Sequence, residues 1–296
     1  MNIKKVFIVG AGFMGSGIAE NVAQKDLLAV LYDISEKNIE KSRAGLEKKL
    51  DRRIKKGKIT EEDKKGIISR IEYVTDIKEC HDADVVIEAV SENRDLKISI
   101  MKEIDQHAKK EAIIASNTSS ISITTLGSVF KDPSRFVGMH FFSPVPVMPL
   151  LEIVRGFQTG DRTKKVANQL GEYLGKTCIH SRDEAGFIIN RMLLPMLNEA
   201  CILVERRVGT IEEIDTGAKL GLNHPMGPLE LMDMIGIDVE LAVMKVLYEE
   251  IGDPKYRPAQ SLRRMVDSGY LGRKTGKGFY IYHEDGTKTP NTRMLK

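Results

Sequence analysis

The chain has 296 residues, of which 42% are hydrophobic and 29% charged, and 45 Lys and Arg against 42 Asp and Glu leave a formal net charge of +3. This size indicates one or two domains with a core that needs no disulfide or metal staples. The small, mixed charge argues against a nucleic-acid partner. No apolar run approaches the roughly 20 residues of a membrane span, so no membrane partner is expected.

The cysteines are three in number, widely spaced and without a CxxC pair: Cys80, Cys178 and Cys201. This pattern argues against both a disulfide framework and a structural zinc site. We therefore expect no metal site and a reducing compartment, the cytoplasm. The N-terminal lysines and apolar residues resemble a signal peptide only superficially, because the apolar run is short and ends in glycines.

The first part of the chain alternates strand-like and helix-like segments. This alternation predicts an α/β fold with a mostly parallel sheet and helices on both faces. Apolar runs predict strands over residues 5–9, 28–32, 71–74, 84–90, 112–116, 136–142, 150–154 and 177–180. Residues 15–24 have the apolar spacing of a helix, and Ser35 is a typical N-cap for the long charged helix that follows.

Beyond residue 186 the sequence is typical of consecutive helices. We expect them over residues 187–206, 211–221, 228–235, 238–251 and 258–268. The predicted domains are therefore 1–185, which carries the sheet, and 186–296, which is smaller and all-α. The helical domain is apolar enough to bury surface against another molecule, which favours a homodimer formed through it.

A glycine-rich loop, GAGFMG, follows the first strand and opens the first helix. This order predicts a Rossmann-type dinucleotide site in which Gly10 permits the turn, Gly12 admits a pyrophosphate and Gly15 lets helix and strand pack. Asp33 ends the second strand, where an acid binds the ribose hydroxyls of NAD and repels the 2′-phosphate of NADP. The alternative is a structural turn and a surface aspartate. The predicted loop contacts are Gly10, Ala11, Gly12, Phe13, Met14 and Gly15.

His140 and Glu152 lie on two strand-like runs separated by a proline-rich stretch. If the runs fold back antiparallel, these residues are symmetric about Pro146 and face each other, although the long loop leaves the register open. A carboxylate beside an imidazole suits a general base that removes a hydroxyl proton. The alternative is a histidine with a core or surface role, and we interpret the other five histidines as structural or surface residues.

Six segments occur together in this order: GAGFMGSGIA (10–19), ASNTSS (115–120), GMHFFSPVPVM (138–148), GFIINRMLLPMLNEA (186–200), HPMGPLELMDMIGID (224–238) and GRKTGKGFY (272–280). Through them nearly the whole chain resembles the L-3-hydroxyacyl-CoA dehydrogenase family, particularly its 3-hydroxybutyryl-CoA dehydrogenase type. The resemblance implies NAD-dependent oxidation of (S)-3-hydroxyacyl-CoA and reverse reduction of acetoacetyl-CoA. It also implies the catalytic roles: His140 as base, Glu152 as its electrostatic partner, and Ser119 and Asn190 as holders of the substrate oxygen.

The resemblance further implies contacts to both nucleotides. For NAD these are Asp33, Glu92, Lys97, Asn117, Ser119, Ser143 and Lys274. For CoA they are Ser119, Asn190 and two lysines of a basic helical hairpin near residues 41–65, Lys49 and Lys56. Taken alone, Ser119 is an ordinary turn serine, Asn190 a helix-surface amide and the hairpin a solvated charged face. The chain departs from the family pattern at Ser143, where asparagine is usual, and in a linker without the usual proline.

Two other functions fit parts of this pattern. A dehydrogenase of free hydroxy acids, similar to the L-gulonate type, has the glycine loop but a histidine–proline pair where this chain has His-Phe-Phe. A non-enzymatic nucleotide sensor has no need of the four catalytic candidates together. Acetoacetyl-CoA, assayed against free acetoacetate, discriminates between these functions.

Overall fold

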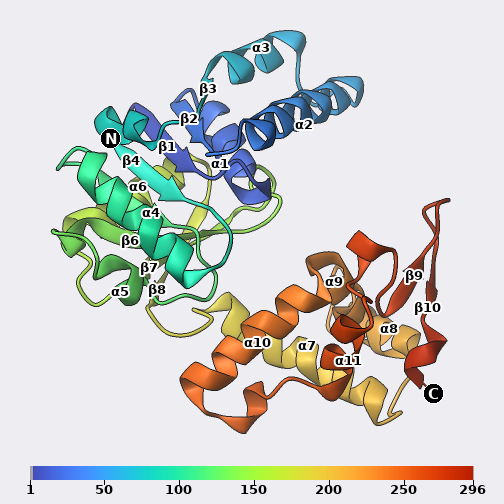
Figure 1. The fold of residues 1–296 in the computed structure, drawn as a ribbon. Coiled ribbons are helices and arrows are strands. Elements are labelled where there is room, and N and C mark those ends of the chain that lie inside the picture. The colour runs from blue at the N-terminus through green and yellow to red at the C-terminus, as the bar shows by residue number, and fades with distance from the viewer. Residues whose placement is uncertain (1–2, 296) are drawn as a thin grey trace. The chain divides into compact units, whose positions relative to one another are not determined.

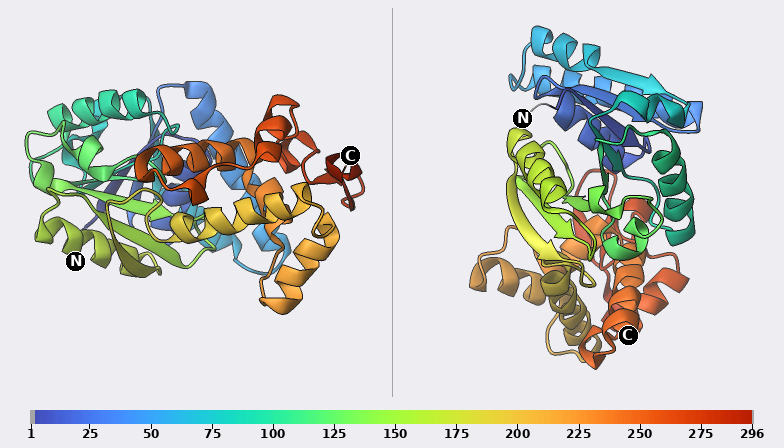
Figure 2. Two further views of the ribbon diagram at one scale, coloured as in Figure 1. Left: turned by 90° about the horizontal axis from the view of Figure 1, so that it is seen from below. Right: turned by 90° about the vertical axis from the view of Figure 1, so that its left-hand side faces the viewer.

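The computed structural model describes residues 3–295, and the chain divides after Glu184 into two compact units. The predicted boundary, between residues 185 and 186, lies one residue further along. The first unit is built on an eight-stranded sheet and the second is mainly helical (Figures 1 and 2). No helix in the described range is both long and apolar enough to cross a membrane.

The sheet has the strand order β3-β2-β1-β4-β5-β6-β7-β8. Neighbours from β3 through β6 pair in parallel, β7 is antiparallel to β6, and β8 is parallel to β7. The strands are β1 (Lys5–Val9), β2 (Leu28–Tyr32), β3 (Ile71–Val74), β4 (Val85–Glu88), β5 (Ile113–Ser116), β6 (Phe136–Phe141), β7 (Leu150–Arg155) and β8 (Thr177–Arg182). The predicted mostly parallel sheet is confirmed, with every strand end within two residues of its predicted position.

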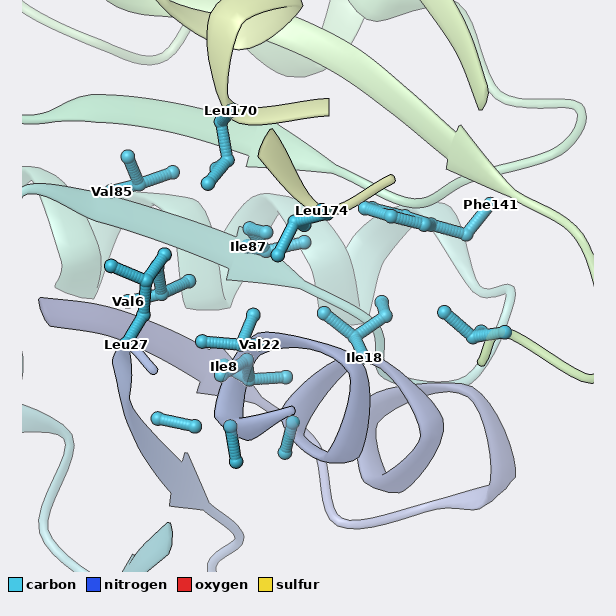
Figure 3. Packing of buried hydrophobic residues seen from close by; sticks show 14 of the residues in the cluster. Val6, Ile8, Ile18, Val22, Leu27, Val85, Ile87, Phe141, Leu170 and Leu174 are labelled. Atoms are coloured by element: carbon cyan, nitrogen blue, oxygen red, sulfur yellow. The ribbon is translucent and has the colours of Figure 1, made fainter. Parts of the chain in front are cut away.

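Helices cover both faces of this sheet. On one face, Ile8 and Ile87 of the central strands pack with Ile18 and Val22 of the first helix and Leu170 of the last (Figure 3). The opposite face is covered by α4 (Arg94–His107) and α5 (Ile123–Gly127) (Figure 1). The helices of the unit are α1 (Phe13–Ala23), α2 (Glu36–Lys55), α3 (Glu61–Ser69), α4 (Arg94–His107), α5 (Ile123–Gly127) and α6 (Asp161–Tyr173).

The predicted helical hairpin is formed by α2 and α3, and it is longer than the 41–65 region in which we expected it. Ser35 is the N-cap of α2, as predicted, and its side chain accepts from the Asn38 backbone N–H. Thr60 caps α3 through a reciprocal pair with Asp63, because the Thr60 Oγ1 accepts from the Asp63 N–H at 3.0 Å and Asp63 Oδ2 accepts from the Thr60 N–H at 2.8 Å.

The second unit contains the five predicted helices, each within two residues of its expected ends. They are α7 (Ile189–Glu205), α8 (Ile211–Gly221), α9 (Pro228–Ile235), α10 (Ile237–Ile251) and α11 (Gln260–Asp267). The unit is helical but not all-α, because β9 (Tyr280–Tyr282) and β10 (Lys288–Pro290) form an antiparallel hairpin. Strands of three residues are too short to give a readable alternation of polar and apolar residues.

Asp233 of α9 anchors this hairpin. Its carboxylate accepts from the backbone N–H groups of Phe279 and Tyr280 at 2.9 and 2.8 Å, and from the Tyr282 hydroxyl at 3.0 Å. A β-carbon on Gly278 would lie 1.9 Å from Asp233 Oδ1, so only glycine fits there. Burial raises the pKa of Asp233 to about 6. These contacts give a structural reason for the GKGFY sequence.

The burial of Glu240 in α10 predicts that the stability of the second unit depends on pH. Its side chain is buried, its Oε2 has no hydrogen-bond partner among the described residues, and burial raises its pKa from 4.5 to about 8. The unfolded chain loses this proton at a lower pH, so stability is highest below about pH 4.5 and falls as the pH rises towards 8. We expect Glu240→Gln to stabilise the unit at pH 7 by an amount on the order of 3 kcal/mol. Urea unfolding at pH 5 and pH 8 measures this, and an equal effect of the substitution at both values contradicts it.

Candidate active site

His140 of β6 and Glu152 of β7 form a buried pair. The antiparallel register places them directly opposite each other, as the fold-back about Pro146 predicted. His140 Nδ1 lies 2.7 Å from Glu152 Oε2, and the two side chains are 8% and 0% exposed. Phe142 packs against the imidazole with ring centroids 4.6 Å apart. A buried carboxyl group at Nδ1 holds the imidazole in one orientation, which suits a general base.

The pair lies on the same sheet edge as the glycine loop. Strands β1, β4, β5 and β6 are parallel, so their carboxyl ends meet at one edge. The glycine loop follows β1, Asn117 follows β5, and His140 is near the end of β6. The strand order changes direction between β1 and β4, and ligands of such sheets bind at this crevice.

Close contacts and backbone conformation explain why glycine occupies positions 10 and 15 of the loop. A β-carbon on Gly15 would lie 1.8 Å from the Gly10 carbonyl oxygen, so helix α1 can approach β1 only with glycine there. Gly10 has φ +107°, a conformation that favours glycine. At Gly12, by contrast, an added β-carbon would meet no atom of a more distant described residue within 4 Å. This open position is where the motif predicts the pyrophosphate.

The N-terminus of α1 also fits an anionic group. Gly12 is its N-cap, and within residues 3–295 no side-chain cap hydrogen bond is formed at this end. Asp33, at the end of β2, accepts from the backbone N–H groups of Ala11 and Ser35, both at 2.9 Å. The donors of the helix end and a fixed acid at the ribose position together fit a dinucleotide without a 2′-phosphate.

Glu92 and Lys97 organise the loop that carries Ser119. Glu92 Oε1 accepts from the Thr118 hydroxyl at 2.6 Å and from the Ser119 and Ser120 backbone N–H groups at 3.0 and 3.1 Å. Burial acts to raise the pKa of Glu92, but the Lys97 ammonium and these hydrogen bonds outweigh it, so the net pKa is lowered. The carboxylate is therefore charged at neutral pH and ties the loop to the sheet.

Lys97 is buried, with only 1% of its side chain exposed. Its Nζ lies 2.6 Å from Glu88 Oε1 and 3.3 Å from Glu92 Oε2. Glu88, 0% exposed, also accepts from the Ser116 hydroxyl at 2.6 Å. Glu88 was not predicted as a site residue, although a carboxylate at the end of an apolar strand is a usable signal. The three charged side chains thus connect β4, α4 and the Ser119 loop. The predicted cofactor contacts of Glu92 and Lys97 stay a prediction.

The loop from β6 to β7 is fixed by two further side chains. Asn117 Oδ1 accepts from the Phe141 N–H at 2.8 Å, and Lys176 donates to the carbonyls of Val145 and Met148, the latter at 2.9 Å. Lys176 is 7% exposed, and its pKa is lowered chiefly by burial. Sequence reasoning missed this lysine, because nothing local indicates backbone partners so distant in the chain. Ser143 lies in this loop and is exposed.

A cleft of about 460 Å³ opens between the glycine loop, α2 and residues 144–146. Lys41 and Lys49 line it, and Lys49 is held by Glu20 of α1, Nζ to Oε2 at 2.6 Å. Lys56 is the exposed C-cap of α2 and is not among the lining residues. The geometry thus brings Lys49, but not Lys56, to the nucleotide-binding edge.

Two predicted site residues belong to the second unit. Asn190 lies in the first turn of α7, after Gly186 and Phe187 in left-handed backbone conformations. Lys274 forms an ion pair with Asp238. Their predicted roles remain predictions. No group of three or more His, Cys, Asp or Glu side chains within residues 3–295 is arranged to hold a metal ion.

Both units are similar to known proteins. Residues 5–184 match the family model of the 3-hydroxyacyl-CoA dehydrogenase NAD-binding domain, and residues 186–282 match that of its C-terminal domain. A probable 3-hydroxybutyryl-CoA dehydrogenase of Deinococcus radiodurans is 46% identical over 94% of this chain and 100% of its own length. The 3-hydroxybutyryl-CoA dehydrogenase of Bradyrhizobium diazoefficiens is 45% identical over 98% and 99%.

Solved structures agree as well. The crystal structure of (S)-3-hydroxybutyryl-CoA dehydrogenase from Ralstonia eutropha is 52% identical, with a TM-score of 0.92, and covers 96% of this chain and 100% of its own. The two family models match one unit each, and these relatives extend across both units. The chain therefore belongs to the 3-hydroxyacyl-CoA dehydrogenase family and is an NAD-dependent oxidoreductase.

Proposed function

We propose that this chain oxidises (S)-3-hydroxybutyryl-CoA to acetoacetyl-CoA with NAD, and catalyses the reverse reduction. The observation that carries the proposal is the buried His140–Glu152 pair, 2.7 Å from Nδ1 to Oε2, on the sheet edge that carries the glycine loop. This geometry supports the assignment of His140 as a general base beside the proposed hydride-acceptor site. The names of the relatives from Deinococcus, Bradyrhizobium and Ralstonia support the choice of substrate.

In the proposed oxidation, bound NAD supplies the hydride acceptor. Glu152 holds Nδ1 of His140, which assigns removal of the 3-hydroxyl proton to Nε2. The carboxylate then offsets the positive charge on the imidazole. Ser119 and Asn190 are assigned to the substrate oxygen, where a fixed hydroxyl and amide stabilise the negative charge that develops. The loop contacts of Glu92 support the role of Ser119, because they hold its backbone in place.

The remaining assignments are part of the same proposal. The CoA phosphates bind along the cleft that Lys49 lines, and the position of Lys49 in this cleft supports its role. Lys56 does not line the cleft, so the cleft gives no support to a role for Lys56. The helical unit lines the acyl pocket and joins two copies into a homodimer. Exposed apolar side chains on this unit support the homodimer, among them Met192, Leu220 and Leu222. The cysteines, all free thiols, support a cytoplasmic location.

A steady-state assay tests the function. We expect rapid NADH oxidation with acetoacetyl-CoA and none with free acetoacetate, because the cleft beside the glycine loop offers cations to CoA phosphates. Turnover of free acetoacetate alone would favour the hydroxy-acid alternative. Absence of turnover with every 3-ketoacyl-CoA, despite NADH binding, would favour a nucleotide sensor.

Asp33 determines the preference for NAD in this proposal. Its carboxylate is fixed by two backbone N–H groups, so it cannot turn away from a 2′-phosphate. We expect Asp33→Ala to raise the KM for NADH about tenfold, the loss of one charge-assisted hydrogen bond, and to improve NADPH relative to NADH. Glu40→Gln, which removes an exposed carboxylate from α2, is the control. An unchanged ratio of kcat/KM values for the two cofactors in Asp33→Ala would refute this role.

A further inference from the structure

A carboxylate at the end of the first unit holds the segment that follows Ser119. Asp183 comes directly after β8 and is the second-last residue of this unit. Asp183 Oδ1 accepts from the Ile123 backbone N–H at 2.8 Å. Asp183 Oδ2 accepts from the Thr124 backbone N–H at 2.7 Å and from the hydroxyl of Ser122, the N-cap of α5, at 2.8 Å. One carboxylate therefore ties the start of α5 to the end of β8 (Figure 1).

The residues between Ser119 and these contacts are also hydrogen-bonded. Thr118 Oγ1 accepts from the two backbone N–H groups that follow Ser119, at 3.3 and 3.0 Å. Glu92 accepts from the Thr118 hydroxyl and the Ser119 N–H, as described above. Residues 118–124 thus form one hydrogen-bonded segment, with Glu92 at its beginning and Asp183 at its end. Ser119 lies between the two carboxylates that hold this segment.

The same segment is fixed to the strand of the proposed base. Ile123, whose N–H donates to Asp183, is 1% exposed, and α5 packs on β6, the strand that carries His140. The contacts of Asp183 therefore hold the end of the Ser119 segment where it meets β6. The placement of Ser119 relative to His140 depends on these contacts as well as on those of Glu92.

We propose that Asp183 is a positioning residue that keeps the Ser119 hydroxyl at the substrate oxygen. The inference rests on the proposed function, in which this hydroxyl stabilises the negative charge that develops on that oxygen. Such a donor must be held accurately, because a misplacement of about 1 Å costs up to about 10²-fold in rate. A carboxylate with three donors in a single segment provides this constraint without contact to the substrate.

A double-mutant cycle on acetoacetyl-CoA reduction tests the proposal. In Asp183→Asn an amide NH₂ replaces one acceptor oxygen, so at least one of the three hydrogen bonds is lost. We expect kcat to fall about 10- to 10²-fold, while the Kd for NADH stays nearly unchanged. In the Ser119→Ala background the same substitution should change kcat little, because no hydroxyl remains to be positioned.

Two further variants separate positioning from folding. Ser122→Ala removes one donor to Asp183 and should lower kcat by less than Asp183→Asn does. Asp132→Asn is the matched control, because this exposed carboxylate also accepts from a backbone N–H and a hydroxyl, those of Ser134 at 3.1 and 2.6 Å, but it precedes β6. Its kcat should stay unchanged. Hydrogen exchange of peptides covering 117–124 should be faster in Asp183→Asn and unchanged in Asp132→Asn.

The outcomes distinguish this inference from the proposed function. A normal kcat in Asp183→Asn, or the same loss with and without the Ser119 hydroxyl, would overturn the inference and leave the function standing. A normal kcat in Ser119→Ala would remove Ser119 from the mechanism and the inference with it. No reduction of acetoacetyl-CoA by the unmodified chain would overturn the function itself. If Asp183→Asn does not fold, Ser122→Ala takes its place in the cycle, with the same outcomes.

Discussion

Replacement of His140 with glutamine should lower kcat for acetoacetyl-CoA reduction by about 10³-fold, the range of general acid–base catalysis, while the Kd for NADH stays nearly unchanged. Glutamine retains the size and polarity of the side chain but neither accepts nor releases a proton at neutral pH. The side chain is 8% exposed and lies on a buried strand, so a substitution of similar volume disturbs packing little. Stopped-flow turnover and fluorescence titration with NADH measure the two quantities.

Two variants sharpen this test. Glu152→Gln keeps the hydrogen-bonding shape of the pair and removes its charge, so turnover should fall while NADH binding persists. His180→Gln, which changes an exposed histidine on β8, should leave turnover unchanged. Near-normal turnover of His140→Gln, or equal losses in both histidine variants, would remove the base from the mechanism.

The fold was predictable where burial on both sides of the sheet controls the sequence. Parallel strands covered by helices on two faces give continuous apolar runs, and β1, β2 and β3 begin and end as predicted. Helix N-caps were predictable because the cap residue and the helix it begins are adjacent in the sequence, as Ser35 illustrates. The β9–β10 hairpin was not, because its short strands depend on Asp233, a partner far away in the sequence.

In the candidate site, the pairing of His140 with Glu152 was predictable from the sequence, whereas the surroundings of the charged residues were not. The facing of His140 and Glu152 follows from the symmetry of two strands about a proline-rich loop, and it is confirmed. Local sequence does not reveal that Lys97 is buried against Glu88, or that Lys49 is held by Glu20. A charged side chain has the same local signature on a surface as in a buried pair, and only the fold brings its partner.

Replacement of Lys97 with methionine should destabilise the NAD-binding unit by about 3–5 kcal/mol. Methionine fills most of the volume of lysine but leaves the Glu88 carboxylate, which is 0% exposed, without its cation. A buried unpaired charge costs far more than the pair itself contributes. Glu92 loses the same cation, so the Ser119 loop should loosen and kcat should fall as well.

Hydrogen exchange of peptides from β4 and β5 measures this loss within the unit that carries it. A change of about 3–5 kcal/mol corresponds to exchange faster by roughly 10² to 10⁴. The exposed pair of Arg155 and Asp161, 3.1 Å apart with side chains 47% and 88% exposed, provides the control. Arg155→Met should cost less than about 1 kcal/mol. The double variant Lys97→Met/Glu88→Gln also removes the unpaired carboxylate and should recover part of the lost stability. Equal exchange rates in Lys97→Met and Arg155→Met would show that Lys97 does not stabilise the unit in this way.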